Sequence, residues 1–211
     1  NITDKSIPIH AMIGDQQSAA IGQNCFNPGD IKATFGTGCF ILLNTGEKPL
    51  VSNNKLLSTI AYKINNITSY ALEGSIFVSG STIKWLRDEL GIIKNINDSQ
   101  SLAESIKDNN GVYFVPAFTG LGAPHWKPDA RGTIVGLTGS SGKAEIVRAA
   151  LEAVAYQSAD LFDAMAGDGQ KPAIVRVDGA MSANDWLLQF LSSISNIRIE
   201  KSDNKETITI K

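Results

Sequence analysis

The chain has 211 residues, which is enough for one large domain with a sizeable hydrophobic core. Hydrophobic residues make up 43% and charged residues 19%, an ordinary balance for a globular protein. The formal net charge of −2 argues against a nucleic-acid or anionic-membrane partner, because both require a basic surface. No apolar run approaches the roughly 20 residues that span a bilayer, and the first residues resemble no signal peptide. We therefore expect a cytoplasmic protein without integral membrane association.

Two further features bear on the state of the chain. Cys25 and Cys39 have neither a His cluster nor a close cysteine pair beside them, which argues against a disulfide framework and against a zinc site. We expect both thiols to be reduced and buried. The sequence starts at Asn1 without a methionine, close to a predicted core strand, so we expect a piece of a longer protein.

Asp15 is the first candidate site residue. It follows the apolar stretch Ile9–Ile13, which predicts a short buried strand, and it precedes Gln16–Ile21, which predicts the start of a helix. An aspartate at such a corner can cap the helix by accepting bonds from free amides. It can also meet a ligand at the carboxyl edge of a sheet. Position alone leaves both roles open.

The turn Gly36-Thr37-Gly38-Cys39 is the second candidate. It joins two predicted strands, Ile31–Phe35 and Phe40–Asn44. Glycines on either side of Thr37 let backbone amides and a hydroxyl converge on one concavity, which suits an anionic phosphate. Because most turns of this kind only reverse the chain, the motif taken alone is a weak signal of phosphate binding.

The middle of the chain predicts a hairpin of Leu57–Lys63 and Thr68–Glu73, followed by a helix over Ser81–Leu90. Gly80-Ser81-Thr82 falls in the first turn of that helix, where Ser81 caps it or where the free amides bind an anion. Three more segments follow: a helix over Ser99–Lys107, a buried strand over Gly111–Pro116 and a long loop over Ala117–Gly132.

Strands and helices alternate in the last third of the chain. The predicted order is strand Thr133–Leu137, helix Glu145–Ala166, strand Ala173–Val177, a turn over Asp178–Asn184 and helix Asp185–Ser195. The turn is built from small residues, which either let a nucleotide approach the backbone or simply pack a helix on a sheet. Hairpins followed by alternating strands and helices indicate an α/β domain with a mixed β-sheet flanked by helices.

Seven stretches of the chain carry a resemblance when they are taken together and in order. They are Ile7-Pro8-Ile9, Gly14-Asp15-Gln16-Gln17, Phe35-Gly36-Thr37-Gly38-Cys39-Phe40, Asn44-Thr45-Gly46-Glu47-Lys48, Ala71-Leu72-Glu73-Gly74, Trp85-Leu86-Arg87-Asp88-Glu89 and Pro116-Ala117-Phe118-Thr119-Gly120-Leu121-Gly122-Ala123-Pro124. Through them, nearly the whole chain resembles the glycerol kinases of the FGGY carbohydrate kinase family. Gly132–Glu152 is also similar to the second signature of that wider family.

The resemblance implies an actin-like, ribonuclease H-like ATPase domain that acts on glycerol with ATP and Mg²⁺. Asp15 matches the general base of the family and its metal-binding carboxylate. Gln16 and Phe40 match glycerol contacts. The positions that match nucleotide contacts are Thr37, which meets the terminal phosphate, Gly80, Lys84, Ala180 and Asn184.

Three departures from the family pattern stand out. Ala180 replaces a usual glycine, Lys84 replaces a frequent glutamine, and the tail Glu206–Lys211 stops where a final helix begins in the family. Residues 1–211 would then be a carboxyl-terminal ATPase domain without its amino-terminal partner domain and final helix. The resemblance also allows a homo-oligomer. Two alternatives remain open: a non-catalytic remnant or interaction module, and a different FGGY sugar kinase.

Overall fold

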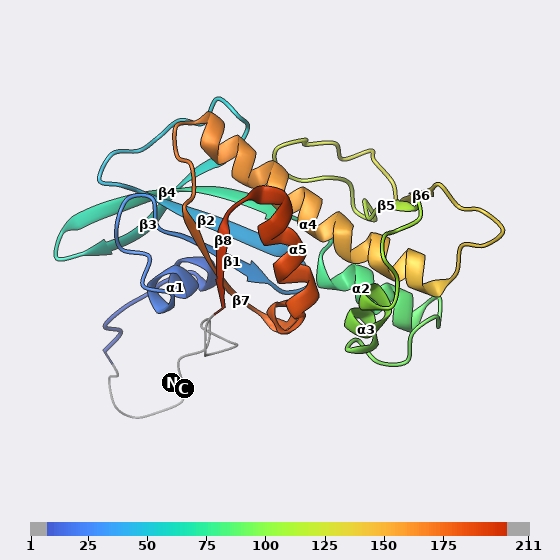
Figure 1. Ribbon diagram of the computed structural model, residues 1–211. Coiled ribbons are helices and arrows are strands. Elements are labelled where there is room, and N and C mark those ends of the chain that lie inside the picture. Colours follow the sequence, from blue (N-terminus) through green and yellow to red (C-terminus); the bar gives the residue numbers. More distant parts are fainter. Residues whose placement is uncertain (1–7, 202–211) are drawn as a thin grey trace.

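A six-stranded mixed sheet forms the centre of the molecule (Figure 1). The computed structural model describes residues 8–201. The strand order is β3-β4-β2-β1-β7-β8, in which β3, β4, β2 and β1 are antiparallel neighbours and β7 and β8 continue parallel to β1. The strands are β1 (Ile31–Phe35), β2 (Cys39–Gly46), β3 (Leu57–Ile64), β4 (Ile67–Ile76), β7 (Ile174–Asp178) and β8 (Arg198–Lys201).

Helices cover both faces of this sheet, and a small second sheet lies at one end (Figure 1). The helices are α1 (Asp15–Gly22), α2 (Gly80–Asp88), α3 (Asp98–Glu104), α4 (Lys143–Gly167), α5 (Asp185–Ser195) and the short 3₁₀ helix η1 (Ala180–Ala183). The small sheet pairs β5 (Tyr113–Val115) with β6 (Thr133–Val135). Within residues 8–201, no helix has both the length and the apolar character that a membrane crossing requires.

The antiparallel part of the sheet follows from local turn chemistry. Asn65 and Asn66 connect β3 to β4 with φ angles of 50° and 65°. Asparagine tolerates this left-handed conformation, and two such residues in a row match the twist of a tight hairpin. The structure confirms both hairpins predicted from the sequence, β1–β2 and β3–β4. It also confirms the long predicted helix, which is α4.

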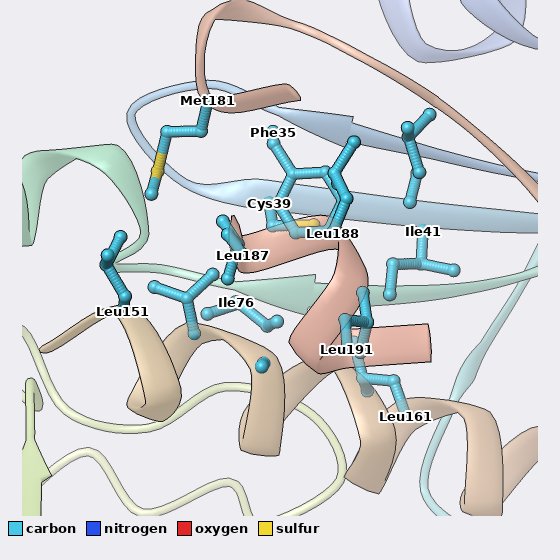
Figure 2. Packing of buried hydrophobic residues seen from close by; sticks show 14 of the residues in the cluster. Phe35, Cys39, Ile41, Ile76, Leu151, Leu161, Met181, Leu187, Leu188 and Leu191 are labelled. Atoms are coloured by element: carbon cyan, nitrogen blue, oxygen red, sulfur yellow. The ribbon is translucent and has the colours of Figure 1, made fainter. Parts of the chain in front are cut away.

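One face of the sheet carries the main hydrophobic core. Ile31, Ala33 and Phe35 alternate along β1 on this face and are completely buried. Figure 2 shows Phe35, Cys39 and Ile41 facing the side chains that α4 and α5 present, Leu161 and Leu191 among them. Side chains on successive strand residues point to opposite faces, so the remaining residues of β1 must face the other side.

That other face is covered by α1 and carries polar side chains. A small apolar cluster holds α1 in place through Ala20, Cys25, Leu42, Ala61 and Ala71. Lys32 and Thr34 of β1 point to the same side, because Lys32 lies opposite Leu42 and Thr34 lies opposite Phe40 in the β1–β2 register. Cys25 and Cys39 are both free and buried, as expected.

The structure corrects three expectations. Ile9–Ile13 is not a buried strand, since it has no regular structure and Ile9 and Met12 are 80% and 89% exposed. The segment pairs with no strand of the six-stranded sheet, whose order is β3-β4-β2-β1-β7-β8. Of the predicted strand at Gly111–Pro116, only β5 forms, and its outer residues are exposed. The edge strand β8 was not predicted. The tail Glu206–Lys211 lies outside the described residues.

Candidate functional site

The start of α1 presents the first candidate residue to solvent. Gly14, and not Asp15, is the N-cap residue of α1, so Asp15 does not have the capping role that the sequence left open. Asp15 is the first helical residue, its side chain is exposed, and its Oδ1 accepts a bond from the Gln16 amide at 2.8 Å. A carboxylate in this place keeps acceptor capacity for a ligand.

Beneath α1 lies a residue that the sequence analysis missed. Lys32, the second residue of β1, is fully buried. Its Nζ donates to Oε1 of Gln16, to Oγ1 of Thr34 at 3.1 Å and to the carbonyl oxygen of Phe40 at 3.3 Å. This ammonium therefore joins the start of α1 to the start of β2, which brings Gln16 and Phe40 to one place.

Carboxylates balance the buried charge. Burial lowers the pKa of Lys32, and the nearby Asp178, Glu73 and Asp15 oppose that shift by favouring the charged form. Burial raises the pKa of Glu73, and Lys32 opposes this shift in turn. Asp178 is buried and accepts a bond from Gln23 Nε2 at 3.1 Å. The polar face of the sheet is thus a network of mutually compensating charges.

The start of α2 is hydrogen-bonded to the turn between β1 and β2, and we call this contact the clasp. The Gly80 amide donates to the Gly36 carbonyl at 3.0 Å, and the Ser81 amide donates to the Thr37 carbonyl at 3.1 Å. The Ser81 hydroxyl also donates to the Thr37 carbonyl at 2.9 Å, so this serine binds the turn instead of capping α2. Thr37 itself is exposed.

Close backbone approach at this clasp requires glycine. A Cβ on Gly80 would lie 2.5 Å from the Gly36 oxygen, and a Cβ on Gly179 would lie 2.5 Å from the Phe35 oxygen. Gly179 also has a φ of 86°, a conformation that side chains disfavour. The end of β1, the start of α2 and the residue before η1 consequently meet at van der Waals distance.

A cavity of about 450 Å³ opens beside this clasp. Its volume falls in the range of about 300–1,000 Å³ that is typical of small-molecule sites. Asn184 lies in its wall, where Oδ1 caps α5 by accepting from the Leu187 amide and Nδ2 donates to Ser99 Oγ at 3.4 Å. The lining residues are Ile83, Ile96, Asn97, Ser99, Gln100, Ser101, Glu104, Ala180, Met181, Ala183 and Asn184.

The predicted site residues fall into three groups. Asp15 and Gln16 begin α1, and Phe40 is tied to Gln16 by Lys32. Thr37 lies in the turn that α2 clasps, three residues before Phe40, and the Gly80 amide donates to Gly36 of the same turn. Ala180 and Asn184 line the cavity, and the sulfur of Met181 between them lies 3.2 Å from the place that a Cβ on Gly80 would take. These three groups form a continuous set of residues from Asp15 to the cavity, which we call the track.

Lys84 stands apart from these groups. It is exposed on α2 and is not among the residues that line the cavity, although its neighbour Ile83 is. Its predicted contact with a nucleotide stays a prediction.

A divalent cation fits this site only if most of its ligands come from outside the described residues. No group of three or more His, Cys, Asp or Glu side chains with metal-binding geometry occurs in the described part of the chain. Mg²⁺ commonly binds through one or two carboxylates, with phosphate oxygens and water completing its shell. The exposed carboxylate of Asp15 is compatible with that arrangement, whereas a cage made of these protein groups alone is not.

The mixed sheet and its flanking helices form an α/β domain of the actin-like, ribonuclease H-like fold. Residues 31–210 match the FGGY family of carbohydrate kinases, C-terminal domain, and the chain belongs to that family.

Several proteins that are similar to this chain are kinases by name. A glycerol kinase from Coxiella burnetii is 58% identical over 196 residues, covering 93% of this chain and 39% of the relative. The crystal structure of Plasmodium falciparum glycerol kinase with ADP superposes with a TM-score of 0.88 at 44% identity, over 96% of this chain and 40% of that one. A xylulose kinase from Rhodospirillum rubrum, at 20% identity, shares the fold with a TM-score of 0.78, over 92% of this chain and 39% of that one. The chain thus spans about two fifths of the length of these relatives.

Proposed function

We propose that this chain is the carboxyl-terminal half of an ATP-dependent glycerol kinase, which converts glycerol to glycerol 3-phosphate. The observation that carries the proposal is the connected track that joins Asp15, Gln16 and Phe40 through the Gly36–Gly38 turn to a cavity of nucleotide-site size. The names of the relatives that match over nearly the whole chain supply the substrate.

The track gives each of its ends a chemical role. Asp15 receives the proton of the attacking hydroxyl and orients that hydroxyl, Gln16 binds the polyol, and Phe40 lies against its carbons. Phosphoryl transfer needs little activation of the nucleophile, so alignment and charge neutralisation provide most of the catalysis. An exposed carboxylate at the first turn of a helix suits this positioning role.

The nucleotide occupies the other end of the track in this proposal. Thr37 contacts the terminal phosphate, Gly80 lets the backbone come close, and Ala180 and Asn184 bound the rest of the nucleotide from the cavity. We assign Lys84, on the exposed face of α2, to an outer contact with an anionic group. Asp15 is the carboxylate that would hold Mg²⁺, and the bound ion would supply neutralisation of phosphate charge.

An amino-terminal partner domain completes the site in this proposal. The matched relatives are about two and a half times as long as this chain, which leaves room for such a domain. The two unpaired thiols are compatible with a reducing compartment, and we propose the cytoplasm.

Calorimetric titration of the 211-residue chain with Mg-ADP tests the nucleotide half of the proposal. We expect saturable binding that Thr37→Ala and Asn184→Ser each weaken about tenfold, the loss of one good polar contact. Serine keeps a good N-cap for α5, so the second variant separates binding from stability. Thr133→Ala, on the exposed strand β6, is the matched control and leaves affinity unchanged. A folded chain that binds no Mg-ADP would count against the site.

The second test joins this chain to the amino-terminal part of the Coxiella burnetii glycerol kinase. We expect the joined enzyme to phosphorylate glycerol with Mg-ATP, and Asp15→Asn to lower its kcat by about 10²–10⁴. A folded joined enzyme that binds Mg-ADP but transfers no phosphoryl group to glycerol, or that prefers a longer sugar, would overturn the assigned substrate.

A further inference from the structure

We propose that Lys32 is a positioning residue of this site: it holds Oε1 of Gln16 and so turns the amide nitrogen of Gln16 toward the bound polyol. The inference rests on the proposed function and names how its substrate end is built. Lys32 touches no substrate in this arrangement, because it lies beneath α1 and is fully buried.

The chemistry of the two side chains fixes the direction of the Gln16 amide. A lysine ammonium has three donors and no acceptor, so only the oxygen of an amide can face it. The reversed amide would set N–H groups against the ammonium. Within residues 8–201, the hydrogen bonds of the Gln16 side chain involve its oxygen, and its Nε2 has no partner there. That nitrogen is therefore available to donate to a hydroxyl oxygen of the substrate.

The same ammonium sets the spacing of the substrate site. Its second and third bonds go to Thr34 Oγ1 at 3.1 Å and to the Phe40 carbonyl at 3.3 Å. One cation thus fixes the start of α1, which carries Asp15 and Gln16, relative to the strand end that carries Phe40. A polyol held between Gln16 and Phe40 depends on that separation.

The cost of burying this charge supports a role beyond packing. A buried ion is expensive, and apolar residues of similar size often give equal or greater stability. The residue opposite Lys32 in the β1–β2 register is the apolar Leu42, and the carboxylates of Asp178, Glu73 and Asp15 compensate the charge of Lys32 from the other sides. What an apolar residue does not supply is a donor for Gln16.

The test is a double-mutant cycle in the joined enzyme. We expect Lys32→Met to raise KM for glycerol about tenfold and to leave KM for Mg-ATP within about twofold, the loss of one oriented polar contact. In the Gln16→Ala background, Lys32→Met should raise KM for glycerol by less than about twofold, because the residue it positions is already gone. Lys63→Met, which removes an exposed lysine from β3, is the matched charge control and leaves both constants unchanged.

Gln16→Glu provides a second test that does not depend on how well Lys32→Met folds. A carboxylate still accepts the Lys32 bond but has no N–H to donate, so we expect native thermal stability and a KM for glycerol as high as that of Gln16→Ala. A native KM in Gln16→Glu would overturn the proposal, as would additive effects of Lys32→Met and Gln16→Ala or equal increases in both KM values. An unmodified joined enzyme that is inactive on glycerol would instead refute the proposed function.

Discussion

Gly80→Ala tests whether the clasp between α2 and the Gly36–Gly38 turn holds the site together. The added methyl group would lie 2.5 Å from the Gly36 oxygen and 3.2 Å from the Met181 sulfur. Ordinary contacts lie at about 3.5–4.0 Å, so α2 and the turn must separate by roughly 1 Å. The shift would break or stretch the 3.0 Å bond from the Gly80 amide to the Gly36 carbonyl.

Two opposing effects set the size of the change. Alanine favours a helix over glycine by about 0.8–1 kcal/mol. Overpacking against backbone costs about 1–3 kcal/mol, and the lost hydrogen bond about 1 kcal/mol more. The steric clash and the lost hydrogen bond together outweigh the gain in helix propensity, so we expect a net destabilisation of about 1–3 kcal/mol. For a domain of this size that corresponds to a fall in Tm of roughly 2–12 °C.

Thermal unfolding and Mg-ADP titration measure the two consequences separately. We expect Gly80→Ala to lower Tm and to weaken Mg-ADP binding, because Thr37 moves with the turn. Gly139→Ala is the matched control, since nothing lies within 4 Å of the added methyl group. A Tm for Gly80→Ala that equals or exceeds that of Gly139→Ala would refute the reasoning, because the added methyl group would then meet no costly clash.

Three further predictions address other parts of the molecule. Glu152→Ala leaves the partly buried Arg148 without its 2.8 Å carboxylate partner and should cost about 1.5–3 kcal/mol in chemical denaturation, whereas Asp88→Ala, in an exposed ion pair, should leave the midpoint unchanged. Burial raises the pKa of Cys25 to about 11, so this thiol should not react with a disulfide reagent at pH 8 until the protein unfolds. The folded state holds the thiol proton of Cys25 more tightly than the unfolded state does. The contribution of this thiol to the free energy of unfolding should therefore be lost as the pH rises from about 9 to 11. Asp15→Asn should lower kcat of the joined enzyme by about 10²–10⁴ without changing Tm, because Asp15 is exposed and does not cap α1; a large fall in Tm would show instead a structural role.

Local patterns predicted the elements whose stability is local. The Asn65-Asn66 turn determines the β3–β4 hairpin, and the spacing of apolar residues along α4 follows the face that it buries. Asp185–Ser195 coincides with α5 because Asn184 caps its start and the left-handed Asn196 ends it. Each of these signals involves residues a few positions apart.

The errors arise where the deciding contact is remote in sequence. Ile9–Ile13 has the apolar composition of a strand, but composition does not say whether a neighbouring strand exists to pair with it. In β8, three of four residues are charged, which hides an edge strand from any search for apolar runs. An edge strand with solvent on one side tolerates such residues.

Lys32 shows the same limit within the site. Lysine is almost never fully buried without partners, so a lysine inside a strand is ordinarily assigned to the solvent side. Its actual surroundings come from α1, Thr34 and Phe40, which converge only in the folded molecule. The alternation of Lys32 and Thr34 with apolar residues was the available signal of a polar sheet face. The roles of the site residues came from resemblance to a family, not from any local pattern.

The position of β1 in the middle of the sheet has a consequence for hydrogen exchange. Its amides are paired or covered by β2 and β7 on its two sides, and exchange there requires opening of the central sheet. Such amides usually exchange only when the whole domain unfolds. The Gly36–Gly38 turn follows β1 directly and is hydrogen-bonded to the start of α2, so we expect its movement to be coupled to that of both elements. Slow exchange in β1 should therefore persist with or without nucleotide.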